Sequence, residues 1–181
     1  AWIINHAGDR VMMTDLTFVP LLEKIADKLP SIERYVVLTD AAHLPKTTLK
    51  NAVAYEDWIG EVDGDFTWKS FDENTAAGMC YTSGTTGHPK GALVTHGKHL
   101  AATDTVIAQY PTLREKPHRT VVFLPMCHVL GRDVAITLPL ISQLVPHFGE
   151  DPEDFATTFF EVAPTVMFTV PRYLQKFASH I

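Results

Sequence analysis

The apolar residues of the chain follow two alternating patterns, and together these predict strands separated by helices. Short apolar runs bounded by turn residues predict strands at 10–14, 34–40, 76–82, 92–96, 119–125 and 165–170. Apolar residues three and four positions apart predict helices at the chain start, at 19–29, 96–110, 134–145 and 151–162, and from Pro171 onward. Strands that alternate with helices predict an α/β fold, with a mainly parallel layered sheet and flanking helices.

Polar residues predict where two of these helices begin. Thr95 precedes the helix at 96–110 and can cap it with its hydroxyl group. Asp151 is the expected cap of a later helix, because Pro152 follows in the first turn and Phe155 begins an apolar face.

Two segments have a weaker or ambiguous pattern. Residues 41–74 place many acidic side chains around a few aromatic ones, which predicts a solvated connection without regular structure. Residues 134–145 are apolar on every side and predict a buried helix that is interrupted or bent at Pro139.

Composition limits the classes of protein that the chain can belong to. It has 181 residues, of which 46% are hydrophobic and 20% charged, so one globular domain with a sizeable core is expected. A net charge of -6 argues against nucleic-acid binding, and no apolar run is long enough for a membrane span. Cys80 and Cys127 both lie in apolar runs, which predicts buried free thiols in a reducing, cytoplasmic compartment.

One segment, TSGTTGHPKG at residues 82–91, combines glycines, hydroxyl side chains and a lysine. Gly84 and Gly87 allow backbone conformations in which successive N–H groups turn toward one anion. Lys90 adds a positive charge, and Pro89 restricts how the chain leaves the turn. Neutral hydroxyl donors complete the set: Thr82, Ser83, Thr85 and Thr86.

Two interpretations of this segment remain open from composition alone. It is either a polyphosphate-binding loop or an ordinary polar turn, since glycine, serine, threonine and proline are common turn residues. It is not a Walker A loop, because Lys90 follows a proline and precedes Gly91.

The longer sequence YTSGTTGHPKGALVTH closely resembles the phosphate-binding signature of the adenylate-forming superfamily. LPMCHVLG at 124–131 resembles the next motif of that superfamily, with Cys127 where an aromatic residue is common. The segments AWIINHAGDRVMMTD and APTVMFTVPRYLQKF resemble the corresponding parts of fatty acyl-CoA synthetases. The resemblance covers nearly the whole chain and favours medium- or long-chain fatty acyl-CoA synthetases.

The resemblance implies activation of a fatty acid by ATP to acyl-AMP, followed by transfer to coenzyme A. Residues 82–91 would hold the ATP phosphates, and Thr82 would help to bind Mg²⁺. His128 would line the place where the acyl carboxylate meets the α-phosphate, although a histidine with a hydrogen-bond partner at a strand end fits the same position. The helix predicted at 134–145 would be either the wall of the acyl pocket or ordinary core.

The sequence lacks the later motifs of the superfamily, so we expect residues 1–181 to be an internal part of the large N-terminal domain. The tyrosine-glycine-x-threonine-glutamate motif and the mobile C-terminal domain do not occur within it. We expect the isolated chain to lack full activity, and surface exposed by truncation to favour self-association. The alternative is a folded, non-catalytic segment that binds phosphate or belongs to an assembly.

A few further histidine and charged residues could in principle form a metal or catalytic site. His96 and His99 lie three positions apart on a predicted helix, but no further ligand at zinc spacing accompanies them. Asp104 and the Arg132–Asp133 pair are expected to be surface or capping charges.

Overall fold

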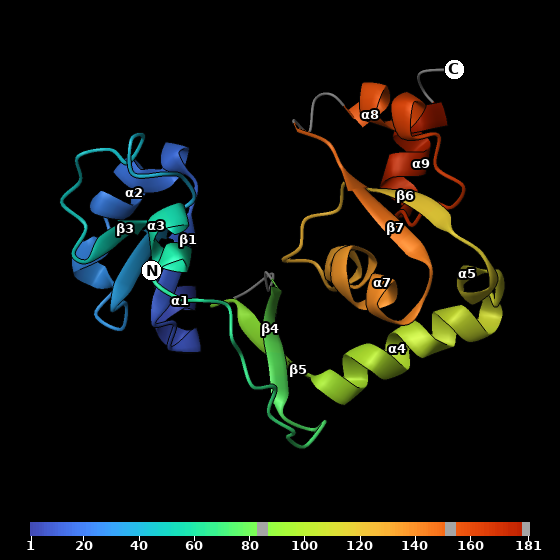
Figure 1. Cartoon of the computed structure of the whole chain (residues 1–181), viewed down its shortest axis with the longest axis horizontal. Helices are drawn as coiled ribbons and strands as arrows, with labels where there is room; N and C mark the ends of the chain where they lie inside the picture. Colours follow the sequence, from blue (N-terminus) through green and yellow to red (C-terminus); the bar gives the residue numbers. More distant parts are fainter. Residues whose placement is uncertain (83–86, 151–154, 179–181) are drawn as a thin grey trace. The chain divides into compact units, whose positions relative to one another are not determined.

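The computed structural model describes residues 1–82, 87–150 and 155–178 (Figure 1). The contacts divide the chain into two compact units. Among the described residues, the first unit holds 1–70 with 87–89, and the second holds 71–82 with 90–178. Each unit is described by itself.

The first unit is a small parallel sheet covered by short helices. The strands pair in parallel in the order β1-β2-β3, with Met13 and Val53 on either side of Val36. Its core gathers Val19, Leu22, Tyr35, Val37 and Leu49. The elements are α1 (Trp2–Ala7), β1 (Val11–Thr14), η1 (Leu16–Phe18), α2 (Val19–Glu23), η2 (Ala26–Lys28), β2 (Arg34–Val37), β3 (Ala52–Ala54) and α3 (Tyr55–Gly60).

The second unit contains an antiparallel hairpin and a parallel strand pair, joined by helices. Strand β4 pairs antiparallel with β5, and β6 pairs in parallel with β7. A core of Ile107, Leu113, Val134, Leu138 and Leu144 packs beneath the β6–β7 pair. The elements are β4 (Ala76–Thr82), β5 (Lys90–Thr95), α4 (His96–Gln109), α5 (Thr112–Glu115), β6 (His118–Val122), α6 (Val129–Arg132), the π-helical turn η3 (Asp133–Thr137), α7 (Leu138–Ile141), β7 (Leu144–Phe148), α8 (Phe155–Val162) and α9 (Pro171–Ala178).

These elements confirm the predicted α/β class, with parallel pairing in two of the three sheets. Thr95 caps α4 as predicted, because its Oγ1 accepts a hydrogen bond from the Lys98 amide at 3.3 Å. The predicted cap at Asp151 lies outside the described residues. Within the described part of the chain, no helix has the length and apolar character that a membrane crossing needs.

The prediction that 41–74 lacks regular structure was wrong. Strand β3 and helix α3 lie inside this segment. Asn51 takes a left-handed conformation, with φ of 55°, that turns the chain into the short strand. Glu56 and Asp57 then occupy the first turn of α3, where acidic side chains stabilise the positive end of a helix.

Part of the segment 41–74 before β3 is held by hydrogen bonds to the side chain of Glu23 rather than by a ladder of backbone bonds. The Glu23 carboxylate accepts hydrogen bonds from the Thr48 amide at 2.7 Å and the Thr47 hydroxyl at 2.8 Å. These hydrogen bonds, the Thr48 amide first, lower the pKa of Glu23 from its ordinary value.

The predicted helix at 19–29 is shorter than expected. Helix α2 ends at Glu23, and Ile25 departs from helical geometry at φ of -122° before the 3-10 turn at 26–28. Val19 and Leu22 of α2 both lie in the core. The packing of these two side chains stabilises the short helix, so a longer helix is not needed.

The prediction of one helix at 134–145, interrupted or bent at Pro139, was correct only for the first part of the segment. Residues 134–141 are helical, with the π-helical turn leading into α7, and the chain then extends into β7 from Leu144. Pro139 lies at the start of α7, so the change of helix type occurs next to the proline.

The predicted strand at 165–170 forms no ladder. Only its first residues bond to β6, where the Thr165 and Val166 amides both donate to the Arg119 carbonyl. Arg119 further donates through its side chain to the carbonyls of Val162 and Ala163. The segment is thus tied to the edge of β6 by a turn.

The prediction of two buried thiols was wrong, because Cys80 is half-buried and Cys127 is exposed. Cys127 lies beyond the end of β6 at Val122, in the segment that leads to α6. The apolar run at 119–125 therefore continues past the strand into an exposed loop.

Leu138 and Leu140 on α7 make a matched test of this core. Leu138 is 1% exposed and Leu140 is 76% exposed. Leu138→Ala should lower the free energy of unfolding by about 2–5 kcal/mol, because it leaves a cavity. Leu140→Ala should change it by less than about 0.5 kcal/mol. Urea unfolding followed by circular dichroism measures both, and equal effects would contradict the assigned core.

Candidate nucleotide-binding site

The β4–β5 hairpin carries the glycine-rich segment (Figure 1). Its last paired positions are Thr82 and Lys90, which face each other across the antiparallel ladder. Both side chains are exposed. The hairpin therefore brings together the first hydroxyl residue and the lysine of the candidate phosphate loop.

Only part of the loop itself falls in the described residues. Gly87 has a φ of 89°, a left-handed conformation that disfavours any residue with a side chain. The candidate residues Ser83, Gly84, Thr85 and Thr86 lie outside the described residues.

His88 packs against the N-terminal helix within the first unit. Its ring stacks on the Trp2 indole with 4.8 Å between the ring centroids and 5° between the planes. Trp2 also stacks on His6, with 4.6 Å between centroids. The sequence contained no signal for this stack, since periodicity does not relate residues so far apart.

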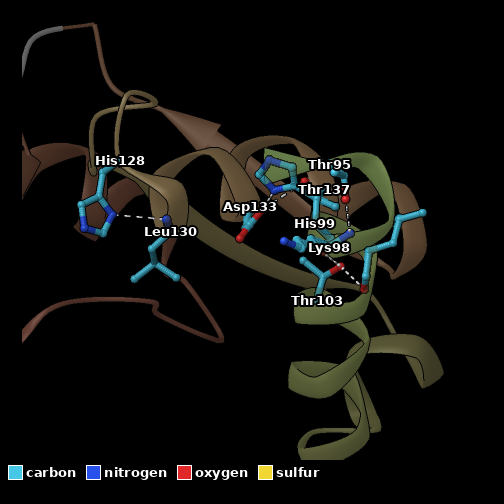
Figure 2. Close-up of polar contacts among 9 residues, drawn as sticks. Thr95, Lys98, His99, Thr103, His128, Leu130, Asp133 and Thr137 are labelled. Atoms are coloured by element: carbon cyan, nitrogen blue, oxygen red, sulfur yellow. Dashed lines mark hydrogen bonds and ion pairs between the residues drawn. The ribbon is translucent and has the colours of Figure 1, made fainter. Parts of the chain in front are cut away.

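The segment after β6 forms a tight turn into α6. The His128 amide donates to the Pro125 carbonyl at 2.9 Å, and the Nδ1 of His128 accepts from the Leu130 amide at 3.2 Å (Figure 2). His128 is exposed and serves as the cap of α6. Because Nδ1 accepts this hydrogen bond, Nε2 is the ring nitrogen that can contact solvent or a ligand.

Gly131 allows this turn to close. A Cβ atom at this position would lie 2.4 Å from the Pro125 carbonyl oxygen and 2.7 Å from that of Leu124. Both contacts are to backbone atoms, which cannot swing aside as a side chain can. The glycine of the LPMCHVLG motif thus fixes the direction in which His128 enters α6.

An apolar cavity of about 280 Å³ lies at the carboxyl ends of the parallel strands β6 and β7. Ligands commonly bind at this edge of parallel sheets. The Phe123 ring lies 4.8 Å from Phe155 and 4.7 Å from Tyr173, measured between centroids, and all three line the cavity. Met126, two residues before His128, also lines it.

The predicted acyl-pocket wall at 134–145 does not line this cavity. Val134, Leu138 and Leu144 lie in the core instead, so ordinary core was the correct alternative for these residues. The lining residues Phe123 and Phe155 were missed as candidates, although their positions near predicted strand and helix ends gave a usable signal.

A buried polar contact joins α4 to the π-helical turn (Figure 2). The Nδ1 of His99 lies 2.8 Å from Oδ1 of Asp133, and the Thr137 hydroxyl donates to the same oxygen at 3.2 Å. His99 is 6% exposed and Asp133 8%. The prediction of a surface charge at Asp133 was therefore wrong, whereas its alternative, a cap, is correct because Asp133 is the C-terminal cap of α6. His99 has a carboxylate partner. A hydrogen bond to a charged group stabilises a fold by about 1.5–3 kcal/mol.

Comparison with known proteins assigns the chain to a family. The AMP-binding enzyme family matches residues 1–181, and the chain belongs to it. Among its relatives, the medium-chain-fatty-acid–CoA ligase of Ectopseudomonas oleovorans is 37% identical over 129 residues, which are 71% of this chain and 23% of that protein. The long-chain-fatty-acid–CoA ligase of Thermus thermophilus is 29% identical over an alignment of 184 positions, which covers 97% of this chain and 32% of that protein.

Solved structures share the fold at lower sequence identity. An anthranilate CoA ligase in complex with anthranoyl-AMP has a TM-score of 0.80 at 22% identity, over 93% of this chain and 32% of its own. ATP-bound MatB from Rhodopseudomonas palustris has a TM-score of 0.65 at 20% identity, over 97% of this chain and 32% of its own. The chain thus spans about a quarter to a third of the length of these proteins.

Gly131 and Gly60 give a test of the turn before α6. Gly131→Ala should lower the free energy of unfolding by about 2–3 kcal/mol, because the new methyl group meets backbone atoms. Gly60→Ala, where nothing lies within 4 Å of the added atom, should change it by less than about 1 kcal/mol. Thermal unfolding of the two variants measures the difference, and a tolerated Gly131→Ala would contradict the geometry of the turn.

Proposed function

We propose that this chain belongs to an AMP-forming acyl-CoA ligase that activates a fatty acid, and that residues 82–91 hold the phosphates of ATP. The observation that carries the proposal is the hairpin that pairs Thr82 with Lys90, in a chain of the AMP-binding enzyme family. Residues 1–181 would be part of the N-terminal adenylation domain of a longer protein, since the relatives are about three times as long.

The proposed reaction has two steps, formation of acyl-AMP and transfer of the acyl group to coenzyme A. An oxygen of the fatty carboxylate attacks the α-phosphorus of ATP, and the bond to the β-phosphate oxygen breaks with release of pyrophosphate. The sulfur of coenzyme A then attacks the acyl carbonyl carbon, its proton is lost, and AMP leaves. No covalent bond to the protein forms in either step.

The hairpin would act on the first half-reaction by charge and position. The Lys90 ammonium group and the backbone N–H groups of the loop hold the β- and γ-phosphates, where negative charge accumulates as pyrophosphate leaves. Two supports for this placement are the positive φ of Gly87 and the exposure of Lys90. The same groups restrict the motion of the α-phosphorus relative to the carboxylate.

Magnesium fits the residue types at the hairpin end. Thr82 presents a hydroxyl oxygen, the ligand class that Mg²⁺ prefers, and it lies opposite Lys90. No cluster of three or more carboxylate, histidine or cysteine ligands exists among the described residues. Bound Mg²⁺ would neutralise phosphate charge, with Thr82 as one ligand and phosphate or water oxygens as the others.

The cavity beside β6 and β7 would receive apolar acyl substituents. Phe123 and Met126 of its lining lie in the segment that leads to His128, so acyl chain and carboxylate would lie near one another. His128 would line the reacting end through its Nε2. The cytoplasm is the proposed compartment.

The second candidate is a folded segment that binds phosphate without catalysis, as part of an assembly. It is favoured by exposed apolar side chains such as Trp68 at 88% and Phe66 at 67%, which another protein surface could cover. This candidate includes self-association of the isolated chain.

Pyrophosphate release from ATP tests the proposal, with octanoate and palmitate as the carboxylates. Lys90→Ala should reduce fatty-acid-dependent release by about 10²-fold, because one charge that stabilises the leaving pyrophosphate is lost. Lys98→Ala removes an equal charge from an exposed position on α4 and should leave release unchanged.

The assay should be run on the full-length gene product and on the 181-residue chain. Activity of the full-length protein that does not respond to Lys90→Ala would contradict the phosphate-binding assignment. Phosphate binding without release in either protein would favour the non-catalytic candidate.

A further inference from the structure

The hydrogen bond between His99 and Asp133 connects the two segments to which the proposed function assigns substrate contacts. His99 lies in the first turn of α4, which continues directly from β5 and Lys90. Asp133 is the C-terminal cap of α6, and His128 is the N-terminal cap of the same short helix. Asp133 is thus about one helical turn from His128, whereas His99 lies one turn from the base of the hairpin that carries Lys90 at its other end.

Hydrogen bonds fix Asp133 from two directions. Oδ1 accepts from Nδ1 of His99 at 2.8 Å and from the Thr137 hydroxyl at 3.2 Å. The backbone amide of Asp133 also donates to the carbonyls of Val129 and Leu130. Rotation of the carboxylate would break the bonds to His99 and Thr137, so the carboxylate defines the position of α4 relative to α6.

Stability alone is a poor explanation of this pair. A buried polar pair replaced by apolar groups of the same shape often leaves a fold equally stable. The pair also leaves the Nε2 atom of His99 buried without a hydrogen-bond partner among the described residues, which is unfavourable. A hydrogen bond, unlike an apolar contact, depends on the relative orientation of its two groups. The bond between His99 and Asp133 therefore restricts how α4 is placed relative to α6.

The backbone around Asp133 supports the same conclusion. Residues 133–137 form a π-helical turn, a rare geometry that is frequent at functional sites. Asp133, Val134 and Thr137 within the turn are all buried.

We propose that His99 and Asp133 are positioning residues that hold the Lys90 hairpin and the His128 turn in the arrangement needed for carboxylate adenylation. This inference rests on the proposed function of the same site. Neither residue would contact a substrate.

The test is ATP–pyrophosphate exchange by the full-length gene product carrying variants of His99. His99→Leu removes the donor, whereas His99→Asn places an amide N–H near the position of Nδ1. A displaced segment can cost about 10²-fold in rate, so we expect kcat of His99→Leu to fall by about 10–100-fold with KM for ATP changed little. His99→Asn should restore kcat to within about threefold of the original protein.

Leu113→Ala is the control for general destabilisation, because Leu113 is 1% exposed in the same core and distant in sequence from both segments. It should lower Tm while kcat, measured well below Tm, stays unchanged. If His99→Leu does not fold, His99→Gln replaces it, since its longer side chain puts the amide near the Nε2 position. Equal kcat in the donor-deleted and donor-retaining variants would overturn the proposal, as would an equal loss in Leu113→Ala.

Amide hydrogen exchange separates failure of this inference from failure of the proposed function. Loss of the His99 donor should speed exchange both at 92–95 and at 129–131, and His99→Asn should reverse both changes. If the original protein shows no fatty-acid-dependent ATP–pyrophosphate exchange, the proposed function fails whatever the amide hydrogen exchange shows. Faster amide exchange confined to α4 would show that the pair does not couple the two segments.

Discussion

The pairing of Thr82 with Lys90 is the constraint on which the candidate site depends. A loop rich in glycine, serine and threonine has many accessible conformations, and its donors converge on one anion only if its ends are held. The antiparallel ladder of β4 and β5 holds those ends, from Ala76 opposite Thr95 to Thr82 opposite Lys90. Because Thr95 also caps α4, the hairpin is fixed at its base to a helix of 14 residues.

The remaining features of the second unit extend this constraint toward the other candidate residues. The side chain of His99 joins α4 to the turn that follows α6, and Gly131 lets α6 itself pack against the carbonyl groups of residues 124 and 125. His128 is thereby presented at the end of β6, beside an apolar cavity with an aromatic lining. The polar and apolar parts of the candidate site thus belong to elements that bond to one another.

The sequence predicted the elements whose signal is local. The cap at Thr95, the strand at 76–82 and the helix that starts at Pro171 depend on neighbouring residues, and the structure confirms them. The α/β class followed from the alternation of such elements. The family was recognisable because the phosphate-loop signature is long and continuous.

The failures came from residues whose conformation depends on distant partners. Most residues of 134–145 are apolar, and only the pairing of Leu144 with His118 turns their end into a strand. Asp133 looked like a surface charge because its partner His99 is 34 positions away. The stack of His88 on Trp2 was hidden for the same reason, since it follows neither a helical nor a strand period. The cavity lining differs, because Phe123 and Phe155 lie near predicted strand and helix ends.

Protection of amides by α,β-methylene-ATP, which cannot release pyrophosphate, together with a fatty acid tests the central claim most directly. In the full-length gene product, saturating amounts of both ligands should slow hydrogen exchange at 81–91 and at 124–131 together. The account predicts this joint protection, and predicts that inorganic pyrophosphate protects only the first of the two segments. Protection by the two ligands at neither segment would contradict the assignment of the hairpin and the His128 turn to one nucleotide-binding site.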